Sequence, residues 1–130
     1  MENRVARLCF DEQESILYIT ALPDRMLDIE SAEEHFKMIS EITGGRDHYA
    51  MIDSANPYTA TPEAIDFAAR PDTFKARRAA AYFHSCNENR FKIMQVQIKM
   101  KATIPTCAFR EKEEAMLWLR SLNLIKKDTL

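Results

Sequence analysis

The chain has 130 residues, the size of a single domain that can bury an apolar core without disulfides or a structural metal. Its formal net charge of −2 argues against a nucleic-acid partner, because the pairs Arg77-Arg78 and Lys126-Lys127 are too small to make a basic face. The 2 glycines are adjacent, at positions 44 and 45, which excludes a glycine-rich phosphate-binding loop.

The N-terminal part of the chain predicts a β-hairpin. Residues 5–10 and 15–20 are short runs of β-forming side chains, with four polar residues between them. A loop of that length is common between antiparallel strands. Pro23 and Asp24 then end the β pattern. We therefore expect an antiparallel pair of strands at the start of the fold.

A helix is predicted over residues 29–43. Asp28 is the expected N-cap, and Gly44 is expected to end the helix. Ser31 followed by Glu34 is an alternative capping box, which would start the helix about one turn later. Four residues at helical spacing form the expected inward face: Ala32, Phe36, Ile39 and Thr43.

The middle of the chain predicts a strand, a loop and a second helix. Residues 49–52 form a compact apolar strand that ends at Asp53. Thr61 can cap the next helix, with Pro62 at the first helical position, where its missing N–H costs nothing. This helix is expected to end near Arg70, because a proline follows.

The rest of the chain predicts two further strand-helix units. Residues 78–84 are expected to form a strand, because a strand is due there in the alternating order, although the alanines at 79–81 favour a helix. A helix is predicted over 85–101, and a strand over 106–109. The last helix, in which we expect Trp118 to be largely buried, has an apolar face of Ala115, Trp118, Leu119 and Leu122.

The predicted order of elements is ββαβαβαβα, in one domain of residues 1–125 followed by a tail of residues 126–130. Strands that alternate with helices require parallel crossovers. We therefore expect an α/β fold with a single open mixed sheet, in which an antiparallel hairpin joins a parallel set. The middle and last strands should be neighbours or near-neighbours in that sheet.

Several segments of this pattern match one family: residues 15–19, 51–53, 61–63, 105–106, 109, 113–115 and 118–119. On these residues, nearly the whole chain resembles the SpoIIAA-like proteins, relatives of the STAS domain of anti-sigma-factor antagonists. The resemblance is to a bacterial subgroup without an assigned biochemical role. It implies an open mixed sheet with helices mainly on one face, and a non-enzymatic regulatory module that binds an unidentified protein partner.

The resemblance also implies a place for a phosphorylation switch. STAS antagonists carry a phosphorylatable serine, in an Asp-Ser-Ser-Gly motif, at the N-terminus of the helix after the middle strand. This chain lacks that motif, and Thr61, then Thr59, are the residues nearest to the equivalent place. A helix N-terminus favours a phosphate, although Pro62 removes one backbone donor there.

The loop between the middle strand and the second helix is the candidate interaction site, with the residues Asp53, Ser54, Tyr58, Thr59 and Thr61. Asp53 follows a buried strand, where open α/β sheets bind ligands. The alternative is that its carboxylate only holds the turn at 54–56 through backbone N–H groups. Thr61 has the alternative role of an N-cap alone. Tyr58 is expected to be accessible to a partner.

The sequence predicts no catalytic set, no metal site and no cofactor. The histidines, His35, His48 and His84, have no ligand-type partner at the spacing of a helical metal site. The cysteines, at positions 9, 86 and 107, match no disulfide or zinc pattern, which indicates a reducing compartment. With no signal-peptide pattern and no apolar run of about 20 residues, we expect a cytoplasmic protein without membrane insertion.

An alternative function is the binding of a small apolar ligand. The candidate lining residues are Phe83, Phe91, Met94 and Ile98. The resemblance adds that this fold is shared with the lipid-binding CRAL-TRIO domains. Against it, a chain of this length leaves little room for both a core and a cavity of about 300 Å³ or more. The apolar face of the helix predicted over 85–101 is also compatible with a homodimer contact.

Overall fold

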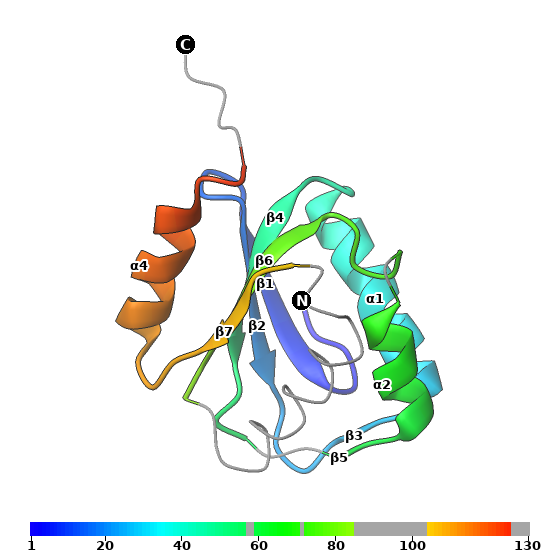
Figure 1. The fold of residues 1–130 in the computed structure, drawn as a ribbon. Helices are drawn as coiled ribbons and strands as arrows, with labels where there is room; N and C mark the ends of the chain where they lie inside the picture. Colours follow the sequence, from blue (N-terminus) through cyan, green and yellow to red (C-terminus); the bar gives the residue numbers. More distant parts are fainter. Residues whose placement is uncertain (57–58, 71, 85–103, 126–130) are drawn as a thin grey trace.

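The computed structural model of the protein describes residues 1–56, 59–70, 72–84 and 104–125 (Figure 1). The strands are β1 (Ala6–Asp11), β2 (Ile16–Ala21), β3 (Met26–Leu27), β4 (His48–Asp53), β5 (Thr59–Ala60), β6 (Arg77–Phe83) and β7 (Thr106–Ala108). The helices are α1 (Ile29–Thr43), α2 (Pro62–Ala69) and α4 (Lys112–Leu122). Every one of these elements was expected from the sequence except β3 and β5. The helix predicted over 85–101 lies outside the described residues.

Five strands form one mixed sheet in the order β1-β2-β4-β6-β7. β1 is antiparallel to β2, whereas β4, β6 and β7 continue the sheet parallel to β2. This confirms the predicted mixed sheet, with the middle strand β4 and the last strand β7 separated by β6. The parallel strands all end at one edge of the sheet, which we call the carboxyl edge.

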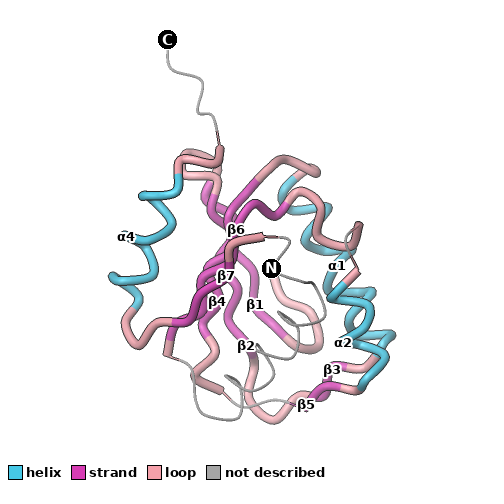
Figure 2. The backbone as a smooth tube through the Cα atoms, in the orientation of Figure 1, coloured by secondary structure: helices cyan, strands magenta, loops and turns pink. Residues whose placement is uncertain are grey.

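Helices cover both faces of the sheet, which forms the central layer (Figures 1 and 2). On one face α4 packs through Ala115 and Leu119, both 0% exposed, in a cluster with Ala81 of β6. On the other face lie α1 and α2, and Ile39 of α1 belongs to a second cluster with Ala80. Two of the three described helices therefore share a face, and α4 covers the opposite one.

The run Ala79-Ala80-Ala81 forms the centre of β6 despite its helical propensity. Ala79 and Ala81 belong to the cluster beneath α4, and Ala80 belongs to the cluster beneath α1. A strand enclosed by helices on both faces is buried at successive residues. That tertiary burial outweighs a helical preference of roughly a few tenths of a kcal/mol per residue.

The start of α1 is set by a reciprocal pair of hydrogen bonds. Oδ1 of Asp28 accepts from the backbone N–H of Ser31 at 2.8 Å, and Oγ of Ser31 accepts from the backbone N–H of Asp28 at 2.9 Å. Asp28 is therefore the N-cap as predicted, and the alternative start at Ser31 is wrong. The helix ends at Thr43, and its C-cap is Gly44, whose φ of 64° lies in the left-handed region that glycine adopts readily.

Trp118 is only partly buried, whereas the sequence led us to expect it largely buried. Its ring packs at 5.6 Å between centroids on Phe109, which follows β7. The deep contacts of α4 are made by the smaller Ala115 and by Leu119. Because β6 presents alanines to α4, the helix can approach the sheet closely, and the large indole ring is left at the margin of the contact.

Candidate functional site

The carboxyl edge brings Asp53 and His84 together. Asp53 is the last residue of β4 and pairs in register with Phe83, the last residue of β6. His84 follows directly, and its Nδ1 lies 3.5 Å from Oδ1 of Asp53. This is the edge at which open α/β sheets bind ligands. The sequence identified Asp53 as a candidate but did not pair it with His84.

The carboxylate of Asp53 also holds the turn that follows β4. Its Oδ1 accepts a hydrogen bond from the backbone N–H of Ala55 at 3.1 Å. This confirms the structural role considered for Asp53 from the sequence. His84 has a φ of 55°, an unusual left-handed conformation for a histidine, and its backbone N–H donates to the carbonyl of Arg110 at 3.3 Å. The turn after β6 is thereby joined to the segment that leads into α4.

Ser54 is a buried part of the same edge. The residue is 2% exposed, and both its backbone N–H and its hydroxyl donate to the carbonyl of Phe83, at 3.0 and 3.3 Å. These bonds tie the end of β4 to the end of β6. The hydroxyl is therefore placed to stabilise the strand ends rather than to meet a partner at the surface.

The loop between β4 and α2 is anchored to the end of β2 and to the segment that follows it. Nδ2 of Asn56 donates to the carbonyl of Ala21 at 3.0 Å. Further along, the backbone N–H of Thr59 donates to the carbonyl of Arg25 at 3.2 Å. Tyr58, which we expected to be accessible, lies outside the described residues. Thr59 is exposed.

The short strands β3 and β5 pair in parallel, with Met26 opposite Thr59. Neither strand was expected from the sequence, because two residues are too few to show a strand period. β3 leads into α1, and β5 leads into α2, so the pair holds the starts of both helices side by side (Figure 1). A signal for this pairing was absent, since it joins residues 33 positions apart (59 − 26).

Thr61 is the N-cap of α2, as predicted. Its Oγ1 accepts from the backbone N–H of Ala64 at 3.2 Å, and Pro62 occupies the first turn. Its own backbone N–H donates to the carbonyl of Leu27 at 2.9 Å. The hydroxyl of Thr61 therefore accepts the capping hydrogen bond. Thr59 is more exposed than Thr61.

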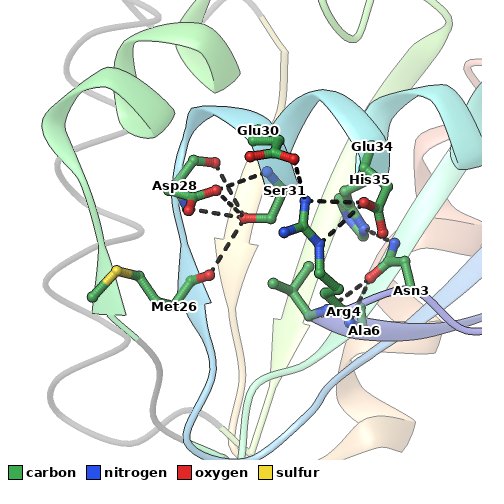
Figure 3. Close-up of polar contacts among 10 residues, drawn as sticks. Asn3, Arg4, Ala6, Met26, Asp28, Glu30, Ser31, Glu34 and His35 are labelled. Atoms are coloured by element: carbon green, nitrogen blue, oxygen red, sulfur yellow. Dashed lines mark hydrogen bonds and ion pairs between the residues drawn. The ribbon is translucent and has the colours of Figure 1, made fainter.

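Two large apolar side chains are exposed where α1 begins. Met26 is 60% exposed and Ile29 is 37% exposed. Figure 3 shows Met26 beside the cap of α1, where its carbonyl accepts from Oγ of Ser31 at 3.3 Å. We call the surface around β3 and β5 the helix-start corner and define it by Met26, Ile29, Glu30, Thr59, Thr61 and Glu63. The two glutamates lie in the first turns of α1 and α2.

The N-terminal residues of the chain are held against α1 (Figure 3). Arg4 forms ion pairs with Glu34 at 3.0 Å and Glu30 at 3.7 Å. Nδ2 of Asn3 lies 2.9 Å from Nδ1 of His35. Burial, with a smaller effect from the positive charge of Arg77, lowers the pKa of His35 to about 4. His35 is therefore neutral at physiological pH and serves this contact as an uncharged group.

The candidate apolar-ligand residues are placed in part. Phe83 is 5% exposed and packs in the cluster beneath α4 with Met51 and Leu119. Phe91, Met94, Ile98 and Cys86 lie outside the described residues. Across the described residues, no group of three or more His, Cys, Asp or Glu side chains is arranged to hold a metal ion. None of the helices in the described part is long and apolar enough to cross a membrane.

Comparison with known proteins bears on the fold. No curated protein matches the chain. One similar solved structure is that of an uncharacterized protein from the DUF3478 family with a SpoIIAA-like fold, from Shewanella loihica PV-4. The two share 15% sequence identity, with a TM-score of 0.62 over 88% of this chain and 91% of that chain. At this identity the match shows a common fold, and it confirms the SpoIIAA-like architecture expected from the sequence.

The family comparison covers most of the chain. The model of a domain of unknown function, DUF7793, matches residues 10–123, which include every described element from β2 to α4. The chain therefore belongs to the DUF7793 family, and its fold is SpoIIAA-like.

Proposed function

We propose that this protein is a non-enzymatic interaction module that binds a protein partner through the helix-start corner. The observation that carries the proposal is the exposure of Met26, at 60%, on a backbone fixed by its pairing with Thr59. A large apolar side chain in water gains free energy when a partner covers it. Because the backbone of the corner is already ordered, binding there loses little conformational entropy of the chain.

The chemistry of the corner indicates the kind of partner. Methionine adapts its shape to the surface that it meets and is common at binding surfaces. Ile29 extends the apolar area, and Glu30 and Glu63 place negative charge at its margins. We therefore expect a partner with a small apolar patch bordered by basic side chains, since opposite charges at the rim favour association.

The arrangement at the carboxyl edge supports the non-enzymatic part of the proposal. Oδ1 of Asp53 lies 3.5 Å from Nδ1 of His84, but the same oxygen accepts the hydrogen bond from Ala55 that holds the turn. The neighbouring hydroxyl, that of Ser54, is buried and donates to a backbone carbonyl. Nucleophilic catalysis requires a base within reach of a nucleophile that can meet substrate, and Ser54 does not satisfy that requirement.

A substitution at Met26 tests the proposal. Tagged wild-type protein and the Met26→Glu variant are used to recover partners from the source cells. The matched control is Leu117→Glu, because Leu117 is 67% exposed on α4, on the opposite face of the sheet from α1. We expect Met26→Glu to lose a partner that wild type and Leu117→Glu both retain. Equal recovery by all three proteins would contradict the proposal.

A further inference from the structure

Arg77, the first residue of β6, is a buried cation. The residue is 8% exposed, and the carbon at the centre of its guanidinium group lies 4.1 Å from the ring centroid of Phe74. The next residue, Arg78, is exposed and forms an ion pair with Asp47 at 2.7 Å. The pairing of β4 with β6 shifts between His48 and Tyr49, so that Arg78 is skipped in the register. Successive side chains of a strand point to opposite faces, and here the first arginine is buried and the second is exposed.

The guanidinium group of Arg77 lacks a counter-ion among the residues that the structure describes. Within that part of the chain, Nε is buried without a hydrogen-bond partner, and no carboxylate forms an ion pair with the side chain. Arginine remains charged inside proteins, although burial lowers the pKa of Arg77 from its ordinary value. Buried charges in native proteins are normally paired. The ring of Phe74 stabilises one face of the cation but cannot accept the N–H bonds at its edge.

The groups around Arg77 are aromatic or uncharged. Phe74 makes an edge-to-face contact with Phe36 of α1 at 5.8 Å, and Phe36 makes another with Phe67 of α2 at 5.9 Å. Burial raises the pKa of Tyr82, on the same strand, and the positive charge of Arg77 opposes this effect. The charge of Arg77 also lowers the pKa of His35, which is neutral at physiological pH. Neither group neutralises the guanidinium.

We propose that Arg77 anchors a binding site for a small organic monocarboxylate, whose charged group binds side-on to Nε–H and Nη–H and whose apolar body packs beside Phe74. Nε has no hydrogen-bond partner among the described residues, and together with one Nη it makes the planar fork that matches the two oxygens of a carboxylate. One guanidinium offers a single positive charge, which suits a monoanion better than a doubly charged phosphate. The row of rings from Phe74 to Phe67 favours an apolar body over a polar one.

This site is separate from the helix-start corner. Arg77 lies at the amino end of β6, next to His48 at the start of β4, whereas the corner lies where α1 and α2 begin. The proposal therefore does not depend on the proposed function. Loss of partner binding in Met26→Glu would leave carboxylate binding unchanged.

The experiment follows the Nε–Hε resonance of Arg77 by NMR while benzoate, acetate or inorganic phosphate is added, and measures each affinity by calorimetry. The variants are Arg77→Met, which keeps most of the side-chain volume without the charge, and the matched control Arg78→Gln. We expect benzoate to shift the Arg77 resonance in wild type and in Arg78→Gln. We expect its affinity to fall at least about tenfold in Arg77→Met, since a charge-assisted fork is lost.

Stability without ligand gives a second readout. Replacing an unpaired buried charge by an apolar side chain should leave the Tm of ligand-free Arg77→Met unchanged or raise it.

Binding of benzoate that survives in Arg77→Met would overturn the proposal, as would an Arg77 resonance that does not respond. Acetate binding as tightly as benzoate would overturn the role given to the rings, and a response to phosphate alone would overturn the choice of a carboxylate. If Arg77→Met does not fold, the wild-type resonance decides.

Discussion

His84 and Asp53, which are 31 positions apart (84 − 53), meet across the ends of β6 and β4, with Nδ1 of the imidazole 3.5 Å from Oδ1 of the carboxylate. Oδ1 of Asp53 also accepts from the backbone N–H of Ala55. One carboxylate oxygen therefore lies close to the imidazole of His84 and fixes the first turn of the loop after β4. The loop begins from a defined position at the carboxyl edge.

The role of Asp53 as a turn residue can be separated from its charge. Asp53→Ala removes the acceptor and should lower the free energy of unfolding by about 1 kcal/mol. Asp53→Asn keeps an oxygen that can accept from Ala55 and should cost less. Urea denaturation of the three proteins measures the difference. If the two variants lose equal stability, the negative charge facing His84 matters more than the turn.

The cap of α1 predicts a pH dependence. The backbone N–H and the hydroxyl of Ser31 donate to Asp28 and lower its pKa in the folded protein from 3.8. The carboxylate therefore stabilises the fold at pH values above 3.8, and this contribution is lost as the pH falls through the lower folded-state pKa. Asp28→Ala should have a lower Tm than wild type at pH 7, with the difference shrinking in acid.

Asp28→Asn is the control for that measurement. Asparagine still accepts the N-cap hydrogen bond but does not titrate. Its Tm difference from Asp28→Ala should persist at low pH, whereas the part of the wild-type advantage that depends on charge disappears. A wild-type advantage over Asp28→Asn that does not change with pH would show that the carboxylate contributes through geometry alone.

The packing of α4 on the sheet rests on Leu119 rather than on the exposed side of the helix. Leu119 is 0% exposed, whereas Leu117 is 67% exposed on the same helix. Leu119→Ala should cost about 3 kcal/mol, because it removes buried methyl groups and leaves a cavity. Leu117→Ala should change stability by no more than about 0.5 kcal/mol. Chemical denaturation of both variants tests this assignment of the two faces.

The N-cap of α2 allows the structural and regulatory roles of Thr61 to be distinguished. Thr61→Ala should cost about 1 kcal/mol by removing the acceptor for the N–H of Ala64, while Thr61→Ser should retain most of that stability. Thr61→Glu places a charge at a helix N-terminus, which the helix tolerates. If the proposed function is right, Thr61→Glu and Thr59→Glu should change the recovery of partners. The Tm of Thr61→Glu should be equal to or higher than that of Thr61→Ala. Unchanged partners in both variants would contradict a phosphorylation switch at Thr59 or Thr61.

Local patterns in the sequence were sufficient for most of the fold. The strand-helix order required parallel crossovers, and the structure has the mixed sheet that this order implies. The caps at Asp28 and Thr61, and the stop at Gly44, were identified because each depends on a few adjacent residues. The turn-holding role of Asp53 was also foreseen, since an aspartate after a strand commonly bonds to the backbone N–H groups that follow it.

Contacts between distant segments were decided by the tertiary structure. The pair β3–β5 joins two-residue segments that have no period of their own, and the meeting of His84 with Asp53 depends on β4 and β6 being neighbours. Arg77 and Arg78 look alike in the sequence, and the packing of helices against the sheet decides that the first is buried and the second is exposed. Periodicity and caps are local properties, whereas register and burial depend on which strands and helices pack together, so one chain position does not reveal them.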